Sequence, residues 1–449
     1  MTFEEVAARS PLRPYHWIVV SICMLVLVAD GIDLQLLGLV APLVIGEWGV
    51  DRGSFGWAMS AALVGMAIGA WGGGYLGDRF GRRNMLAFAA VLFGSATIAA
   101  STADTIPAMA IWRTMGGLGF GAAFPNSLAL VSEWLPDRWR SYAITLISVG
   151  TPAGGAVAAV AAPFLLQGHG WRGAFIFFGL TTLSLVILIF GVLRESPSFL
   201  ISKGRIEEAR QAARAVLPQH IAIRICDRDS VAPVSPIQKT GVFHVSNRRL
   251  NWGIGIGFSA STLVAYAVIS WGTTFLTAAG LTLDQALATS FWVGVSSIAG
   301  ALAAGVLTRR YGSKLVMLLT ATVLLANLIA LTALVEGNSV PPSSALRLSI
   351  QGLVSLNAGV VSIGIATIYV MMTLGYQQSC RSAGIGFGML LGRIGAIGTS
   401  FTGGYLIDLG AGSLTPFLSV LCLGAVLIGA SAFIVDRHVE PAGGPKPTA

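Results

Sequence analysis

The residues that could do chemistry gather in one apolar stretch near the N-terminus. Asp30 and Asp33 stand near the middle of a hydrophobic run, from about residue 17 to residue 44, that is long enough to cross a bilayer. An ionised side chain at that depth costs about 2.5–3.5 kcal/mol on insertion scales, so we expect both acids to face an interior rather than lipid. Their spacing of three residues places the two carboxylates on one face of a helix.

Two arginines complete the set of charged residues well inside apolar segments. Arg113 is predicted either to pair with Asp33 or to take part in transport. Arg393 is predicted either to hold a carboxylate substrate through its planar pair of donors or to pair with Asp30. Burial favours a protonated carboxyl and a nearby arginine favours the ionised form, so alternation between such environments can move a proton. We expect Asp30 and Asp33 to couple protons, with Asp30 as the main carrier. The alternative is a permanent ion pair with Arg113.

Composition identifies a polytopic membrane protein. The 449 residues are 54% hydrophobic and 11% charged, whereas soluble domains have about 25% charged residues. The net charge of +8 lies in loops between apolar segments, which argues against nucleic acid as a partner. The four cysteines are scattered, so neither a disulfide framework nor a metal site is expected. No cofactor is predicted, and the proton is the expected coupling ion.

Twelve apolar segments must position these groups, which predicts an all-α membrane protein of two six-helix bundles. The segments cover about residues 15–44, 54–77, 84–103, 107–131, 141–166, 172–194, 250–279, 286–308, 314–335, 345–373, 383–408 and 413–435. The predicted domains are an N-terminal bundle at 1–194, a polar cytoplasmic linker at 195–249, and a C-terminal bundle with a tail at 250–449.

The loops fix the predicted orientation. With the N-terminus inside, 23 of the 28 Lys and Arg residues lie in cytoplasmic segments, and the outer loops hold only Arg52, Arg172 and Arg347. Basic residues concentrate on the cytoplasmic side of membrane proteins. The sequence therefore predicts an integral protein of the plasma membrane, the inner membrane in a bacterium, with both termini in the cytoplasm.

The two predicted bundles repeat one loop. Residues 74–83 and 305–314 follow the second and eighth segments, and their glycine and basic positions coincide. Duplicated bundles of this kind are typical of transporters with a central site between the repeats.

The first copy of this loop carries a candidate cytoplasmic gate, which consists of Asp78, Arg79, Arg82 and Arg83. A carboxylate is stabilised near a helix N-terminus, and the eleventh segment begins on the same side, near Ser382. The alternative interpretation is that the arginines act only as a topology signal.

Three motifs resemble the major facilitator superfamily. They are Gly74-x-x-x-Asp78-Arg79-x-Gly81-Arg82-Arg83, Arg113-x-x-x-Gly117-x-Gly119-x-Gly121-x-x-x-Pro125 and Glu195-Ser-Pro197 continuing to Gly204-Arg205. Three further features are similar to its aromatic acid:proton symporter family: Asp30-Gly31-Ile-Asp33, Pro125-Asn126 and Gly392-Arg393-Ile-Gly395. The resemblance implies a monomeric transporter that takes up a small organic anion, a benzoate or hydroxybenzoate type of aromatic carboxylate, with protons by alternating access.

Residues that could contact such a substrate include Arg393, Arg113, Asn126, Tyr266 and Trp271. Aromatic and amide side chains suit a flat, polar-edged ligand, and packing in the core is the alternative for each of them. The glycines at 116–121 and 150–155 lie in apolar segments, so we interpret them as sites of close helix packing rather than as a phosphate loop.

Other functions fit the sequence less well. A proton-driven exporter of drugs or metabolites from the same superfamily would use the same acids and is the main alternative. An intramembrane enzyme would need a catalytic or metal-binding cluster within the spans, and the sequence contains none. We therefore do not expect an enzyme. A sensor would need a signalling domain, and the linker of about 50 residues is short for one.

Overall fold

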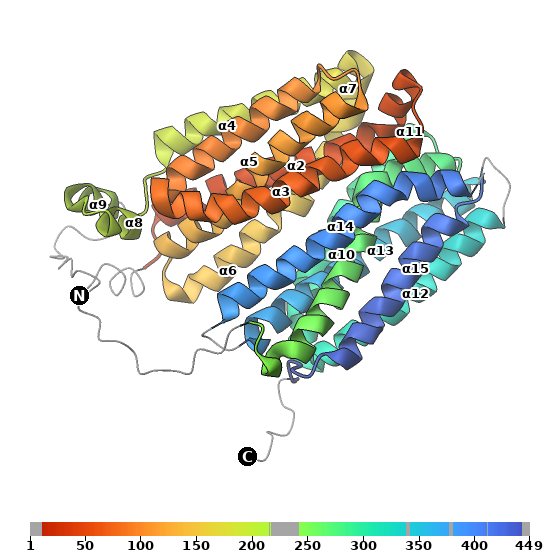
Figure 1. Ribbon diagram of the computed structural model, residues 1–449. Helices are drawn as coiled ribbons and strands as arrows, with labels where there is room; N and C mark the ends of the chain where they lie inside the picture. Colours follow the sequence, from red (N-terminus) through yellow and green to blue (C-terminus); the bar gives the residue numbers. More distant parts are fainter. Residues whose placement is uncertain are drawn as a thin grey trace, which may run out of the picture. The chain divides into compact units, whose positions relative to one another are not determined.

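The computed structural model describes residues 11–214, 216, 242–337, 342–376, 380–410 and 412–441. Within these residues the regular structure is helical (Figure 1). The long helices are α2 (Pro14–Trp48), α3 (Arg52–Phe80), α4 (Arg82–Ala100), α5 (Ile106–Trp134), α7 (Gly150–Val192), α10 (Arg248–Ala278), α11 (Leu283–Tyr311), α12 (Ser313–Glu336), α13 (Ser344–Gly375), α14 (Arg381–Leu409) and α15 (Thr415–Ile434). The short elements are α6 (Asp137–Ser148), α8 (Pro197–Ser202), α9 (Ile206–Ala213) and the 3-10 helix η2 (Val245–Asn247).

These helices account for all twelve predicted spans. In the described part of the chain, ten helices are long and apolar enough to cross a membrane. Helix α5, which carries Arg113, supplies another span although it falls outside those ten. Helix α7 holds two, because the chain turns at Gly170 with φ 63° and ψ −173°. The fifth predicted span consists of α6 and the first part of α7. The predicted all-helical fold is confirmed.

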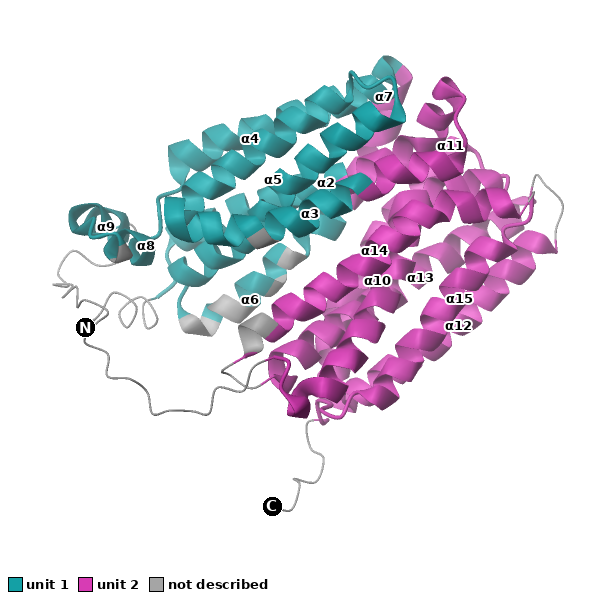
Figure 2. Cartoon of the chain, viewed as in Figure 1, with its two compact units in different colours: residues 1–33, 61–154, 168–235 teal, residues 34–60, 155–167, 236–449 magenta. Residues whose placement is uncertain are grey.

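The chain forms two compact units (Figure 2). The first consists of residues 1–33, 61–154 and 168–235, and the second of residues 34–60, 155–167 and 236–449. The division crosses α2 between Asp33 and Leu34. Residues 215 and 217–241, just under half of the predicted linker at 195–249, lie outside the described residues. The part that is described includes α8 and α9, which follow α7 directly.

Small residues let helices of the first unit approach closely. A Cβ added at Gly117 of α5 would overlap the carbonyl oxygen of Ala62 in α3, and one added at Gly121 would overlap that of Met66. Residues without side chains allow backbones to touch within a membrane. The predicted packing role of the glycines in α5 is confirmed.

In the second unit, the end of α2 packs on α10 and the start of α3 packs on α14. A Cβ at Gly38 of α2 would overlap Ile269 O of α10, and one at Gly56 of α3 would overlap Phe401 O of α14. Nearby, Arg52 Nη1 lies 2.9 Å from Asp408 Oδ1. We call this set of contacts the Arg52 seam. It joins helices that are far apart in the sequence through backbone contact and one ion pair.

Candidate functional site

The centre of the first unit holds a buried ion pair between α2 and α5. Arg113 Nη1 donates to Asp33 Oδ2 at 2.8 Å, and Arg113 Nη2 donates to the backbone oxygen of Asp33 at 3.1 Å. Thr97 of α4 donates to the other carboxylate oxygen of Asp33 at 2.7 Å. Arg113 is 4% exposed and Asp33 is 6% exposed. Both carboxylate oxygens therefore have donors, and the two charges compensate each other away from water.

Arg113 also keeps a spare donor. Its Nε is buried and has no hydrogen-bond partner among the described residues. A guanidinium offers five N–H donors, and this one can serve a substrate oxygen or a water without breaking the bond to Asp33. The predicted pairing of Arg113 with Asp33 is confirmed, and its place in the substrate site stays a prediction.

The second acid lies almost one turn earlier on α2. Asp30 is 4% exposed, and its Oδ2 accepts a hydrogen bond from Thr151 Oγ1 of α7 at 2.8 Å. The adjacent Gly31 packs against the backbone of Thr151, where an added Cβ would overlap Thr151 O. Asp30 thus stands at a close crossing of α2 and α7, and the absence of a side chain at Gly31 permits that approach.

Arg393 lies in the second unit, on α14. Its Nη1 donates to the hydroxyl oxygen of Tyr266 on α10 at 3.1 Å. Tyr369 of α13 lies against Phe258 of α10, with ring centroids 5.2 Å apart. A phenol that accepts from a guanidinium still has its own O–H to donate, so Arg393 and Tyr266 together can present two donors to one carboxylate.

Two other predicted substrate residues occupy helix seams in this structure. Asn126 donates to Gly73 O at 2.9 Å and to Ala122 O at 2.8 Å, which ties α5 to α3. Trp271 is fully buried, and its indole N–H donates to Ser400 O at 3.0 Å, which ties α10 to α14. These contacts fit the packing alternative, and contact of either residue with substrate stays a prediction.

Two residues of the predicted cytoplasmic gate, Asp78 and Arg82, form ion pairs inside the first unit. Asp78 pairs with Arg82 one turn further on, and Arg82 Nε lies 3.4 Å from Glu133 Oε1 at the end of α5. The guanidinium of Arg79 lies over the ring of Phe80. The expected partner of Asp78, the start of α14 near Ser382, has side chains outside the described residues. The gating role therefore stays a prediction.

Arg83 joins the same loop to the segment after α7. Its backbone N–H donates to Glu195 Oε1 at 3.2 Å, and its Nη1 donates to Leu193 O at 3.3 Å. The turn before it needs glycine, because Gly81 has φ 102° and an added Cβ would overlap Glu195. Glu195 belongs to a motif recognised in the sequence, but its contact with the loop was not predicted.

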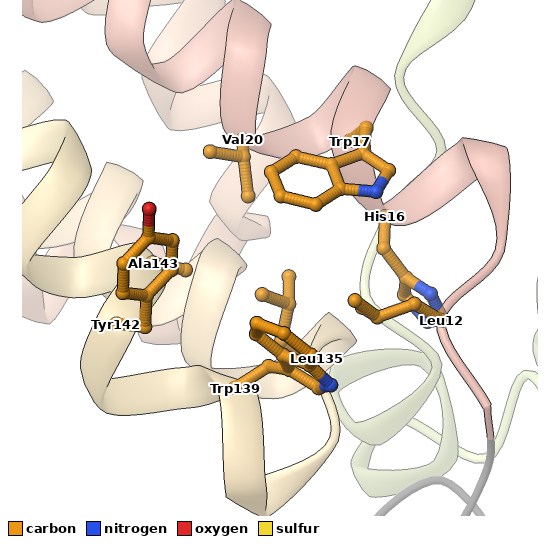
Figure 3. Close-up of a pocket in the computed structure, with 8 residues that line it drawn as sticks. All are labelled: Leu12, His16, Trp17, Val20, Leu135, Trp139, Tyr142 and Ala143. Atoms are coloured by element: carbon orange, nitrogen blue, oxygen red, sulfur yellow. The ribbon is translucent and has the colours of Figure 1, made fainter.

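Two pockets in the described part of the chain lie away from these charged residues. A cavity of about 10 Å³ near the start of α2 is bordered by Trp17, Trp139 and Tyr142, and it has room for a single water at most (Figure 3). A shallow groove of about 630 Å³ runs between α12 and α13. Its lining includes one hydroxyl, Ser349, and no charged side chain, so it does not suit an anion.

Comparisons with known proteins agree with this fold. The family model for the major facilitator superfamily matches residues 23–399. The chain is 30% identical over 437 residues to the 4-hydroxybenzoate transporter PcaK of Acinetobacter baylyi (strain ATCC 33305 / BD413 / ADP1), covering 95% of this chain and 92% of that protein. It is 29% identical to the gallate transporter of Pseudomonas putida, covering 98% and 96% of the two chains.

A solved structure of the xylose transporter XylE from E. coli, in a partially occluded inward open conformation, is similar in fold, with a TM-score of 0.73. The two share 18% sequence identity over 95% of this chain and 99% of that chain. The resemblance to aromatic acid transporters that was predicted from the motifs is confirmed by the relatives. The chain therefore belongs to the major facilitator superfamily and is an integral membrane transporter rather than an enzyme.

Proposed function

We propose that this transporter takes up a hydroxylated benzoate or a similar aromatic carboxylate together with protons, by alternating access. The observation that carries the proposal is the buried group formed by Asp30, Asp33 and Arg113 on α2 and α5. Titratable groups at that depth are costly, and in membrane proteins they mark proton and ion pathways. The names of the two relatives, a 4-hydroxybenzoate transporter and a gallate transporter, support the aromatic acid class.

In this proposal the receptor for the carboxylate of the substrate lies in the second unit. Arg393 is partly buried and hydrogen-bonded to Tyr266, so both side chains are held in place before substrate binds. Preorganised donors lose little conformational entropy on binding. Within the first unit, the buried Nε of Arg113 is the group that we propose for its own contact with substrate. In this proposal Arg393 and Tyr266 hold the carboxylate, whereas the membrane-embedded acids exchange the proton.

The remaining assignments follow from the same proposal. The proton is the coupling ion and no other cofactor takes part. The protein works as a monomer in the inner membrane, with both termini in the cytoplasm, as the distribution of basic residues predicts. Asp78, Arg79, Arg82 and Arg83 act as the cytoplasmic gate.

Uptake assays in proteoliposomes test the proposal. The purified protein is offered radiolabelled 4-hydroxybenzoate, gallate, benzoate, an aliphatic acid, a sugar and an amine, with and without an inward proton gradient. We expect accumulation of the aromatic acids only with the gradient. Accumulation of the sugar or the amine instead would refute the substrate class.

The driving acid and the direction are tested in the same vesicles. Asp30→Asn removes the titratable group. We expect it to lower gradient-driven accumulation at least tenfold, with normal amounts of protein in the membrane. Accumulation by this variant at the wild-type level would contradict the coupling role. Gradient-driven movement of the acids against the proton flow would identify the exporter instead.

A further inference from the structure

Asp30 has a hydroxyl partner that the sequence did not predict. Thr151 Oγ1 lies 2.8 Å from Asp30 Oδ2, and this contact occurs at the close crossing of α2 and α7. The crossing is fixed from both helices, because a Cβ at Gly31 would overlap Thr151 O and a Cβ at Gly154 would overlap Val28 O. The hydroxyl is thus held against the carboxylate by backbone packing and not by its side-chain rotamer alone.

A hydroxyl can serve both protonation states of a carboxyl group. Thr151 donates its proton to an ionised Asp30, and it can accept a hydrogen bond from the O–H of a protonated Asp30 after rotation about one bond. An arginine lacks this property because it has donors but no acceptor. Thr151 can therefore stay hydrogen-bonded to Asp30 in either protonation state, whereas Arg113 can only donate to Asp33.

Two charged residues of the first unit, Asp33 and Arg113, belong to the same buried region as Asp30. Asp33 follows on the same helix, and Arg113 of α5 is bonded to it. Helices α4 and α7 contribute the neutral hydroxyls of Thr97 and Thr151 in this region. Arg393 of α14 is the further charged group that the sequence predicts as a partner of Asp30.

We propose that Thr151 is a positioning residue for proton coupling, which keeps Asp30 hydrogen-bonded in both protonation states and sets the pH at which it titrates. The proton enters and leaves on the Asp30 carboxylate itself. Thr151 only reverses its hydrogen bond, so no proton passes through it. This role rests on the proposed function, because it assigns a partner to the acid that drives uptake.

Removal of the hydroxyl has a definite sign. Thr151→Val keeps the shape of the side chain but loses the donor to the ionised carboxylate. A hydrogen bond to a charged group is strong enough to move a titration by about one pH unit. The protonated form of Asp30 then persists to higher pH, so the titration midpoint moves in the alkaline direction. Thr151→Ser restores the hydroxyl and is expected to stay within about 0.3 pH units of wild type.

The test reads Asp30 directly and needs no substrate. The carboxyl infrared band of the reconstituted protein is followed as a function of pH, and Asp30→Asn identifies the component that belongs to Asp30. We expect Thr151→Val to shift the midpoint of that component upward by about one pH unit. Thr97→Val is the matched control, because it removes the hydroxyl at Asp33 instead. Thr151→Ala takes the place of the valine variant if the latter does not fold.

The proposal is overturned if Thr151→Val leaves the titration midpoint of Asp30 unchanged. It is also overturned if Asp30→Asn removes no component of the carboxyl infrared band. A second measurement records the pH profile of 4-hydroxybenzoate uptake, whose midpoint is expected to shift in parallel while KM stays within twofold. If wild type transports no aromatic acid, the proposed function fails, whereas the infrared titration still decides the role of Thr151.

Discussion

At the scale of single residues, Asp30 and Asp33 of the first unit have different hydrogen-bond partners. Asp33 has a guanidinium on one oxygen and a hydroxyl on the other, whereas Asp30 meets the hydroxyl of Thr151 at a helix crossing. A buried pair of this kind need not add stability compared with apolar residues, but breaking it leaves a charge without its partner. The sensitivity of the site to substitution therefore depends on which member is removed.

Loss of Arg113 tests this asymmetry. Arg113→Leu leaves the buried carboxyl group of Asp33 without its cationic partner, and we expect the protein to lose about 3–5 kcal/mol of stability. The apparent unfolding temperature of the detergent-purified protein measures the loss. The double variant Asp33→Asn, Arg113→Leu removes both charges and is the matched control, with a smaller loss than the single variant. A single variant as stable as wild type would contradict the described ion pair.

The sequence predicted this part of the site in outline. Arginine and aspartate are so costly within a bilayer that their presence at similar depth on α2 and α5 was enough to indicate the pair. Thr97 and Thr151 could not be found in the same way, because hydroxyls are tolerated throughout membrane helices and bond to their own backbone. Only the crossing of the helices selects these two from the others.

At the scale of elements, both copies of the repeated loop are capped by the segment that ends their half of the chain. In the first copy, Glu195 accepts from the backbone N–H of Arg83. In the second copy, the backbone N–H of Ser313 donates to Val439 O at 2.9 Å, and Gly312 takes φ 79° where Gly81 takes φ 102°. The repeat was visible in the sequence from its glycines. The capping contacts were not visible in the sequence, because the side chain of Glu195 caps the first copy and the backbone oxygen of Val439 caps the second.

We expect the tail of the chain to make this second cap sensitive to pH. His438 Nδ1 lies 3.1 Å from Ser313 Oγ, and Nε2 lies 2.9 Å from Ala432 O. Burial lowers the pKa of His438 below its usual value of about 6.5. The docked tail therefore favours the neutral ring. Its stabilisation is complete above about pH 6.5 and is lost as the pH falls below that value, because the free tail then binds the proton more readily.

The backbone N–H of Val439 donates to Ser313 Oγ at 2.8 Å. We expect hydrogen exchange of this N–H to be several-fold faster, relative to the intrinsic rate, at pH 5.5 than at pH 7.5. His438→Gln keeps a polar side chain that does not titrate, so this variant is expected to lose the difference between the two pH values. An equal pH response in both proteins would rule out the histidine as its source.

At the scale of the whole molecule, the twelve spans and their order followed from apolar length, loop charge and the repeat. The compact units did not, because they cut through α2 and are defined by contacts between residues far apart in the chain. The Arg52 seam is one such set of contacts within the second unit. Its ion pair is about one third exposed, and exposed pairs contribute at most about 1 kcal/mol, so the glycine contacts hold the seam.

A bulky residue in the seam tests whether its closure belongs to the transport cycle. Gly56→Val would push a side chain into the backbone at Phe401, and we expect it to lower uptake more than tenfold while substrate still binds. Gly46→Val is the matched control, because an added Cβ there meets open space. Uptake and equilibrium binding of radiolabelled 4-hydroxybenzoate give the two readouts. If Gly56→Val takes up substrate as fast as wild type, transport does not require the Arg52 seam to close.

Proton movement into the vesicle lumen is the most direct test of proton-coupled uptake. A pH-sensitive dye is enclosed in proteoliposomes that start without a gradient, and 4-hydroxybenzoate is added outside. We expect a substrate-dependent acidification of the lumen with the wild-type protein. With Asp30→Asn we expect no acidification beyond the slow leak seen in protein-free vesicles. Entry of the labelled acid through the wild-type protein without any accompanying change of luminal pH would contradict proton-coupled uptake.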